Sequence, residues 1–162
     1  LLLDPELIIA DEPTTALDVT IQADIMELLL ELCNSNKVGL ILITHDLGVV
    51  SQMTDRTLVM YAGKIIEAGK TVEIINDPQH PYTQGLINAL PQQTQPGQRL
   101  QQIPGNMPSL NEISAGCTFN PRCQYASEHC KTTKPEMVHY NDVSVACHEV
   151  NRLHNQTAKV NK

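Results

Sequence analysis

The sequence predicts an α/β fold, and two apolar runs of strand length are the main reason. They are residues 7–12, Leu-Ile-Ile-Ala-Asp-Glu, and residues 40–43, Leu-Ile-Leu-Ile. A helix-length segment lies between them, as in a parallel βαβ unit. Uninterrupted apolar runs of this kind are typical of strands buried on both faces. The 162-residue chain is long enough for one ordinary domain with an appended segment.

The helix between the two strands is predicted to begin at Asp18, a suitable N-cap residue, and to end near Asn34. Apolar residues recur along one face of this helix, and we expect that face to pack on the sheet. The stripe consists of Ile21, Ile25, Leu28, Leu29 and Leu32. Cys33, near the end of the helix, is interpreted as a small buried hydrophobic residue.

The elements expected after the second strand are short. In order, they are a helix at 47–53, strands at 57–61 and 64–68, a helix beginning at 72, and a helix at 82–90. Ala62-Gly63 is expected to join the two strands in a tight turn. Pro78 and Pro81 interrupt the chain between the last two helices.

The composition of the chain changes at Pro91. Residues 91–115 contain four prolines and frequent glutamine, with apolar residues only singly, which indicates a linker rather than a core. We therefore expect a first domain over 1–90, a linker over 91–115, a mostly irregular four-cysteine module over 116–148, and a polar tail over 149–162.

Two adjacent carboxylates follow the first predicted strand. Asp11 and Glu12 would lie at the carboxyl edge of a parallel sheet, where ligands bind in open α/β folds. One acid can hold Mg²⁺ through water, and the other can orient or deprotonate an attacking water, which suits phosphoryl transfer. Acids that merely lead into a helix are equally common at such a position, so this pair alone leaves the choice open.

His45 follows the second predicted strand, in the sequence Thr-His-Asp. A lone histidine after a strand is usually structural or simply exposed. Here two neighbouring strands of one βαβ unit both end in residues capable of chemistry, and their carboxyl ends meet at the same sheet edge. The sequence therefore favours a site formed by Asp11, Glu12 and His45.

Four segments resemble, in order and spacing, the second half of the ATP-binding subunits of ABC transporters. They are residues 7–12, Thr15-Ala16-Leu17-Asp18, His45, and the segment from Tyr61 to Gly69. The resemblance implies that residues 7–12 are the Walker B strand of a P-loop NTPase-type nucleotide-binding domain. It implies that residues 15–18 are the D-loop, and that 61–69 belongs to the hairpin that follows.

The same resemblance implies roles for four residues. Asp11 is the acid on the Mg²⁺ side of ATP, and Glu12 is the catalytic carboxylate. His45 corresponds to the switch histidine that contacts the terminal phosphate. Asp18, in the D-loop, would serve communication with the second ATPase subunit of the dimer.

Other parts of that domain are absent from the sequence. It contains no Gly-x-x-x-x-Gly-Lys-Ser/Thr phosphate loop and no Leu-Ser-Gly-Gly signature. We interpret the chain as the C-terminal part of a longer subunit, and we expect the chain alone to be inactive in ATP hydrolysis. The net charge of −7 argues against a nucleic-acid partner, and no segment approaches the ~20 apolar residues of a membrane span.

Four of the five cysteines lie close together in the sequence: Cys117, Cys123, Cys130 and Cys147. The surrounding segment has few apolar residues, so we expect another device to order it. Disulfides would suit a secreted chain but not the reducing cytosol. The spacing lacks the C-x₂₋₄-C pairs of most zinc sites, whereas a [4Fe–4S] cluster also takes four thiolates; the residues alone leave zinc and iron–sulfur open.

A closer resemblance covers the chain to about His148. Residues 80–86, 103–108, 116–126 and 145–148 resemble the C-terminal segments of the ATPases of dipeptide, oligopeptide and related nickel importers. In some members the four cysteines hold a [4Fe–4S] cluster, so the resemblance favours iron–sulfur over the alternative of zinc. His148 is interpreted as an exposed neighbour, while Arg122 is open to either a role near the cluster or an ordinary surface role.

The resemblance implies an ATP-hydrolysing subunit that couples ATP and Mg²⁺ to peptide uptake. Its partners would be a second ATPase subunit, two integral-membrane permease subunits and, indirectly, an extracytoplasmic peptide-binding protein. It would lie on the cytoplasmic face of the membrane, held there by the permease subunits. The alternative is a non-catalytic metal-binding interaction module on a vestigial α/β scaffold.

Overall fold

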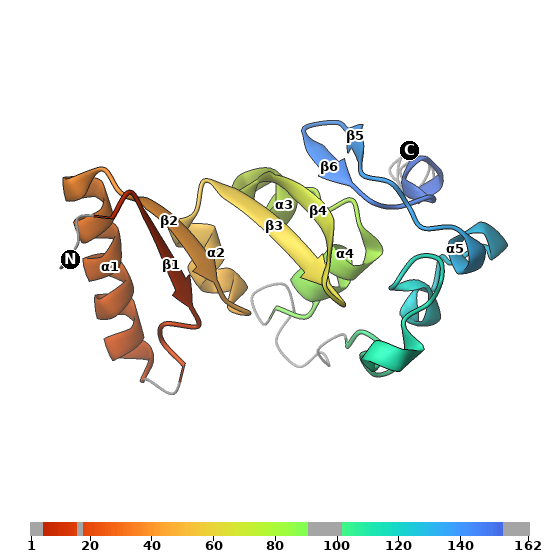
Figure 1. The fold of residues 1–162 in the computed structure, drawn as a ribbon, viewed down its shortest axis with the longest axis horizontal. Coiled ribbons are helices and arrows are strands. Elements are labelled where there is room, and N and C mark those ends of the chain that lie inside the picture. The colour runs from red at the N-terminus through yellow and green to blue at the C-terminus, as the bar shows by residue number, and fades with distance from the viewer. Residues whose placement is uncertain (1–4, 16–17, 91–101, 154–162) are drawn as a thin grey trace. The chain divides into compact units, whose positions relative to one another are not determined.

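The computed structural model describes residues 5–15, 18–90 and 102–153. It is a mixed α/β structure that divides into two compact units, residues 1–54 and 55–162 (Figure 1). Each unit is described by itself below. Within the described residues, no helix is both long enough and apolar enough to cross a bilayer.

The first unit is a βαβ arrangement followed by a short helix. Strands β1 (Leu7–Asp11) and β2 (Gly39–Ile43) pair in parallel, with Asp11 opposite Ile43 at the carboxyl edge. Helix α1 (Val19–Asn36) connects the strands, and helix α2 (Leu47–Met53) follows β2. The predicted strands and helices of this unit are confirmed to within two residues at either end. Asp18 occupies the N-cap position of α1, although its side chain makes no capping hydrogen bond.

The expectation that both strands are buried on both faces is wrong. Burial alternates along each strand, and Ile9, Ile41 and Ile43 remain 63%, 46% and 48% exposed. The predicted stripe of α1 is also largely exposed, since Leu28 is 55% and Ile21 is 47% accessible. The reason is that this unit has a two-stranded sheet, which is too narrow to cover a broad apolar face.

Helix α1 instead buries a narrower face. Met26 and Cys33 are buried, and their separation of seven positions places both side chains on one side of the helix. The interpretation of Cys33 as a small buried hydrophobic residue is thereby confirmed. Helix α1 ends at Lys37, whose left-handed backbone conformation is that of a common C-cap.

The second unit is built on an antiparallel sheet with the strand order β3-β4-β6-β5. Its strands are β3 (Arg56–Tyr61), β4 (Lys64–Lys70), β5 (Val138–Tyr140) and β6 (Val143–Val145). Ala62 and Gly63 both have positive φ angles, 46° and 73°, as a two-residue hairpin turn between β3 and β4 requires. Helices α3 (Thr71–Asn76) and α4 (Pro81–Asn88) follow β4.

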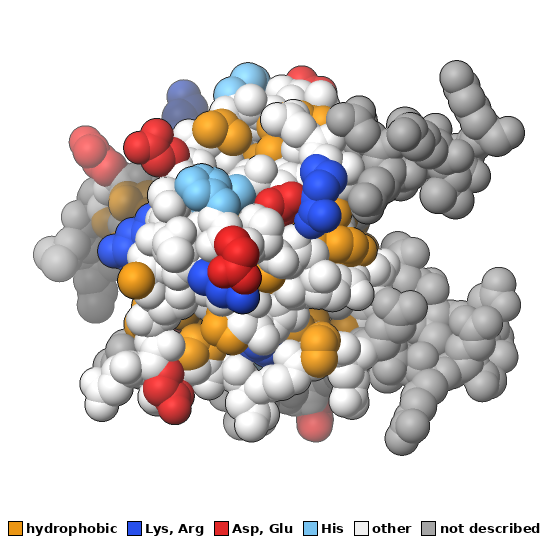
Figure 2. Space-filling model, turned by 90° about the vertical axis from the view of Figure 1, so that its right-hand side faces the viewer, with side chains coloured by type: hydrophobic (Ala, Val, Ile, Leu, Met, Phe, Trp, Pro, Cys, Tyr) orange, Lys and Arg blue, Asp and Glu red, His pale blue; other side chains and the backbone are white. Residues whose placement is uncertain are grey.

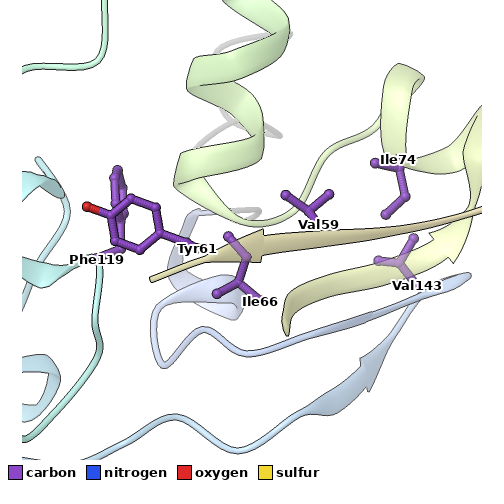
Figure 3. Packing of buried hydrophobic residues seen from close by; sticks show 6 residues of the cluster. All are labelled: Val59, Tyr61, Ile66, Ile74, Phe119 and Val143. Carbon is purple, nitrogen blue, oxygen red and sulfur yellow. The ribbon is translucent and has the colours of Figure 1, made fainter. Parts of the chain in front are cut away.

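The core of the second unit joins residues that are far apart in the sequence. Six buried residues form one cluster: Val59, Tyr61, Ile66, Ile74, Phe119 and Val143. Figure 3 shows the ring of Phe119 beside that of Tyr61, and their centroids lie 5.2 Å apart in an edge-to-face arrangement. Phe119 thus packs the cysteine-rich segment onto the β3–β4 hairpin.

A buried carboxylate anchors the chain before α4. Glu67, on β4, is fully buried and accepts hydrogen bonds from the backbone N–H groups of Gln79 and His80 at 2.6 and 3.1 Å. Burial raises the pKa of Glu67 above its usual range. His80 is also buried, which lowers its pKa to about 4, and its Nδ1 caps α4 by accepting from the Tyr82 N–H. These bonds fix the start of α4 against β4.

The cysteine-rich segment is more regular than the sequence indicates. It contains the 3₁₀ turn η3 (Asn120–Arg122), helix α5 (Glu128–Thr132), and strands β5 and β6. Strand β6 pairs with β4, and Val143, Val145 and Ala146 are buried. The expectation that this segment has too little apolar surface to pack is therefore wrong, because a few apolar residues complete a core begun by β3 and β4.

Part of the predicted linker lies outside the described residues, namely 91–101. The described remainder, from 102, includes the 3₁₀ turn η2 (Leu110–Glu112), closed by a capping box between Ser109 and Glu112. Ile103 packs closely on Gly85 of α4, and the Arg122 side chain donates hydrogen bonds to the carbonyl oxygens of Ile103 and Pro104. Arg122 therefore clamps this stretch of chain to η3.

Candidate functional site: a carboxylate–histidine pair at the edge of the parallel sheet

The structure brings Glu12 and His45 into direct contact. His45 Nδ1 lies 2.7 Å from Glu12 Oε1, although the two residues are 33 positions apart. The contact arises because Glu12 directly follows β1 and His45 lies two residues beyond β2, and the carboxyl ends of these two parallel strands are adjacent. The predicted convergence of these two side chains is present in the fold.

The backbone holds Glu12 in an unusual conformation. Its φ angle of 45° lies in the left-handed region, which a residue with a Cβ seldom adopts. The Glu12 N–H donates to the carbonyl oxygen of Ile43 at 2.8 Å, and the Glu12 carbonyl accepts from the Thr15 N–H at 3.1 Å. Strained conformations of this kind often mark functional positions.

His45 lies in a loop fixed on both sides. The Asp46 N–H donates to the Thr44 hydroxyl at 3.1 Å, and Asp46 Oδ1 accepts from the N–H groups of Gly48 and Val49 at the start of α2. The other oxygen of Asp46 accepts from the Gln22 side chain of α1 at 3.4 Å. His45 is thus presented from a short, capped turn.

The contact shifts the pKa values of both groups. The hydrogen bond from His45 lowers the pKa of the Glu12 carboxyl, and the same bond raises the pKa of the His45 imidazole. An imidazolium–carboxylate pair is thus favoured between these two pKa values. The ion pair is lost when the pH rises above the pKa of His45, which deprotonates the imidazolium, or falls below the pKa of Glu12, which protonates the carboxylate. The side chains are 83% and 36% exposed, so solvent screens the pair and its effect on stability is small.

Among the described residues, the other two candidates, Asp11 and Asp18, form no hydrogen bond with Glu12 or His45. Asp11 is exposed at the end of β1, and Asp18 is exposed at the start of α1. Ala16 and Leu17, between them in the predicted D-loop, lie outside the described residues. A carboxylate such as that of Asp11 is the type of ligand that Mg²⁺ prefers.

The four cysteines of the second unit form no disulfide bond. The Cys117 N–H donates to the Cys130 carbonyl at 2.8 Å, which joins the start of the segment to α5. A Cβ on Gly116 would overlap that same carbonyl oxygen, so the approach requires glycine. Burial raises the pKa of Cys117, Cys123 and Cys147, the last to about 12, and the charge of Cys130 contributes to each increase.

These thiols are not arranged around a single ion. In the part of the chain that the structure describes, no three His, Cys, Asp or Glu side chains could hold one metal ion. His148 Nε2 lies 2.9 Å from the carbonyl oxygen of Thr133, and its ring centroid lies 4.1 Å from that of His129 in a tilted arrangement. On the face shown in Figure 2, histidine, acidic, basic and hydrophobic side chains are interspersed.

Sequence reasoning missed the residues that support the site. Asp46 carries a recognisable signal, since an acid between a strand and a helix is a typical N-cap. The contact of Thr15 with Glu12 has no such signal, because it depends on the left-handed turn at Glu12.

The chain is similar in sequence to proteins of one family. Residues 66–130 match the family described as the C-terminal region of oligopeptide/dipeptide transporters. The chain is 50% identical over 144 residues to the dipeptide transport ATP-binding protein DppD of Haemophilus influenzae, covering 89% of this chain and 44% of that protein. It is 51% identical over 135 residues to the oligopeptide transport ATP-binding protein OppD of Salmonella typhimurium, covering 83% and 40%.

The DppD protein of Escherichia coli is similar to the same degree, at 50% identity over 133 residues, with 82% of this chain and 41% of the relative covered. The chain thus spans less than half the length of the relatives it matches. The resemblance inferred from the short motifs is confirmed by these matches. The chain belongs to the family of dipeptide and oligopeptide transport ATP-binding proteins.

Proposed function

We propose that this chain is part of an ATP-hydrolysing subunit of an importer for dipeptides or oligopeptides. The observation that carries the proposal is the contact between Glu12 and His45 at the carboxyl edge of two parallel strands. The names of the relatives, all transport ATP-binding proteins, support the same activity. They do not favour the alternative of a non-catalytic metal-binding module.

In this proposal Glu12 acts on the water that attacks the terminal phosphate of ATP. An exposed carboxylate with a lowered pKa is ionised at neutral pH, so it can accept a hydrogen bond or a proton from that water. His45 contacts the phosphate, and Asp11 holds Mg²⁺ directly or through water. Asp18 serves the contact with a second ATPase subunit. Because phosphoryl transfer depends mainly on positioning and charge, these four groups suffice for this side of the site.

The subunit would work with partners at a membrane. Two permease subunits would carry the peptide, an extracytoplasmic protein would deliver it, and the ATPase subunits would lie on the cytoplasmic face. In the chain itself, we propose that residues 1–90 belong to the nucleotide-binding domain, that 91–115 is a linker, and that 116–148 is the cysteine module followed by a tail. The module shares its sheet and hydrophobic cluster with β3 and β4, so it would be attached firmly to that domain.

Uptake of labelled substrate by cells tests the proposed cargo. Deleting the gene for the full-length subunit should abolish ATP-dependent uptake of labelled dipeptides or pentapeptides and leave nickel uptake unchanged, because the relatives act on peptides. Complementation with the wild-type gene should restore uptake, whereas complementation with Glu12→Gln should not. Unchanged peptide uptake in the deletion strain would contradict the proposal. Selective loss of nickel uptake would identify nickel, not peptide, as the cargo.

We further propose that Cys117, Cys123, Cys130 and Cys147 bind one [4Fe–4S] cluster with a structural role. The donor set fits the group in number and kind, since four thiolates are its usual ligands. All four lie in the second unit, and the backbone N–H of Cys117 donates to the carbonyl oxygen of Cys130. When bound, the cluster would hold η3, α5 and β6 together.

Metal analysis of anaerobically purified full-length protein checks this assignment. We expect iron and sulfide at the ratio of one [4Fe–4S] cluster per chain, and loss of both in Cys147→Ser. Cys33→Ser is the matched control and should retain the cluster, because Cys33 lies in the other unit, on α1. Stoichiometric zinc without sulfide would replace the cluster by a zinc site, and a folded protein with no metal would remove the hypothesis.

A further inference from the structure

Both oxygens of the Glu12 carboxylate have a hydrogen-bonding partner. His45 Nδ1 lies 2.7 Å from Oε1, and the Thr15 hydroxyl donates to Oε2 at 3.3 Å. The two partners come from different segments, one after β2 and the other three residues beyond Glu12. The carboxylate is therefore held between two groups rather than left to rotate in solvent.

The position of Thr15 follows from the turn at Glu12. The left-handed conformation of Glu12 reverses the chain, and the bond from the Thr15 N–H to the Glu12 carbonyl at 3.1 Å closes the turn. The hydroxyl of Thr15 is thereby brought over the carboxylate of Glu12. Thr15 is itself exposed, so its side chain has no role in a core that would explain its place.

The two partners differ in what they do when ATP is bound. In the proposed function, His45 forms a hydrogen bond with the terminal phosphate when ATP is bound. Its bond to Glu12 then weakens at the moment when the carboxylate must face the attacking water. Thr15 belongs to the same tight turn as Glu12, so its hydroxyl can stay in place while His45 moves.

We propose that Thr15 is a positioning residue that orients the Glu12 carboxylate for its action on water. The inference rests on the proposed function and extends it to a residue that does not itself touch the substrate. Thr15 acts through Glu12, by occupying Oε2 and leaving Oε1 available as His45 turns to the phosphate. A catalytic base must lie within hydrogen-bond reach of its proton, so a carboxylate free to rotate is a poorer base.

The test compares two substitutions of Thr15 in the full-length subunit. Thr15→Val keeps the shape of the side chain and removes the hydroxyl, whereas Thr15→Ser keeps the hydroxyl and removes the methyl group. Loss of a hydrogen bond to a charged group predicts that Thr15→Val lowers kcat for ATP hydrolysis by about tenfold or more. The KM for ATP should change by less than about twofold, since Thr15 does not bind ATP. Thr15→Ser should retain kcat to within about threefold.

Three results would overturn the inference. They are an unchanged kcat in Thr15→Val, a raised KM with unchanged kcat, and equal losses in Thr15→Val and Thr15→Ser, which would point to the methyl group. Thermal unfolding of each variant separates misfolding from misorientation, and equal Tm values are expected because Thr15 is exposed. Glu12→Gln, measured in parallel, separates the proposed role of Glu12 from that of Thr15. If Glu12→Gln retains turnover, the proposed role of Glu12 is wrong. If Glu12→Gln loses turnover while Thr15→Val remains fully active, only the proposed role of Thr15 is wrong.

Discussion

Replacing Glu12 by Gln in the full-length subunit should lower the rate of ATP hydrolysis by about 10²–10⁴-fold, the typical cost of losing one acid–base group. The amide keeps the size of the side chain and can still accept from Thr15, but it carries no charge and cannot take a proton from water. ATP binding should be retained, because in this proposal Glu12 acts on the attacking water and not on the phosphate. Steady-state hydrolysis and ATP affinity, measured on the same preparation, separate the two effects.

Glu31→Gln provides a matched control, since Glu31 is an exposed acid on α1 in the same unit. It should hydrolyse ATP at the wild-type rate. Near-normal turnover in Glu12→Gln would mean that Glu12 is only an acid that leads out of β1, and the contact with His45 would then be structural.

His45→Ala should also lower hydrolysis, by about 10²–10³-fold, which is the usual cost of removing one preorganised donor from a developing charge. The expected loss is in kcat more than in ATP affinity, because the proposed contact with the terminal phosphate matters most in the transition state. The side chain is 83% exposed, so its removal leaves no cavity and should not destabilise the fold. Single-turnover hydrolysis with saturating ATP measures the chemical step directly.

His139→Ala is the control for His45→Ala, because His139 is an exposed histidine on β5 in the other unit. It should leave the rate unchanged. A lower Tm in His45→Ala, with unchanged specific activity of the folded fraction, would contradict the proposed role of His45. It would mean that His45 stabilises the capped turn around Asp46 and takes no part in ATP hydrolysis.

Local pattern was sufficient to predict most of the elements. The apolar runs at β1 and β2 and the turn residues Ala62 and Gly63 each carry their own signal in a few adjacent positions. Strands β5 and β6 carry little signal, because each has only three residues; β5 pairs with β6, and β6 in turn pairs with β4, far away in the sequence. Short elements that depend on non-local partners are the ones that single-sequence reasoning loses.

Burial was predicted less well than secondary structure, because it depends on what else is present. The apolar residues of β1 and the outer stripe of α1 were expected to be covered, yet Ile9 and Leu28 are exposed in a unit with two strands. Conversely, Phe119 and Val145 looked isolated in a polar segment and are buried in the core of the second unit. The pattern shows which faces are apolar, whereas the topology decides which of them find a partner.

The candidate site was predictable where it depends on topology and not where it depends on rotamers. Glu12 and His45 converge because parallel neighbouring strands bring their carboxyl ends together. The hydrogen bond from Thr15 to Glu12 depends on the left-handed turn at Glu12, and the hydrogen bond from Gly48 to Asp46 depends on the cap of α2. Neither hydrogen bond can be predicted from the sequence alone, because each depends on the exact backbone conformation and side-chain rotamer.

The central claim is that the edge formed by Asp11, Glu12 and His45 hydrolyses ATP. Its most direct test is a structure of the full-length Glu12→Gln subunit with ATP and Mg²⁺, in which slow turnover preserves the nucleotide. The account predicts that the terminal phosphate lies between His45 and the side chain at position 12, with Mg²⁺ on the Asp11 side. A nucleotide bound with its terminal phosphate away from these three side chains would contradict it.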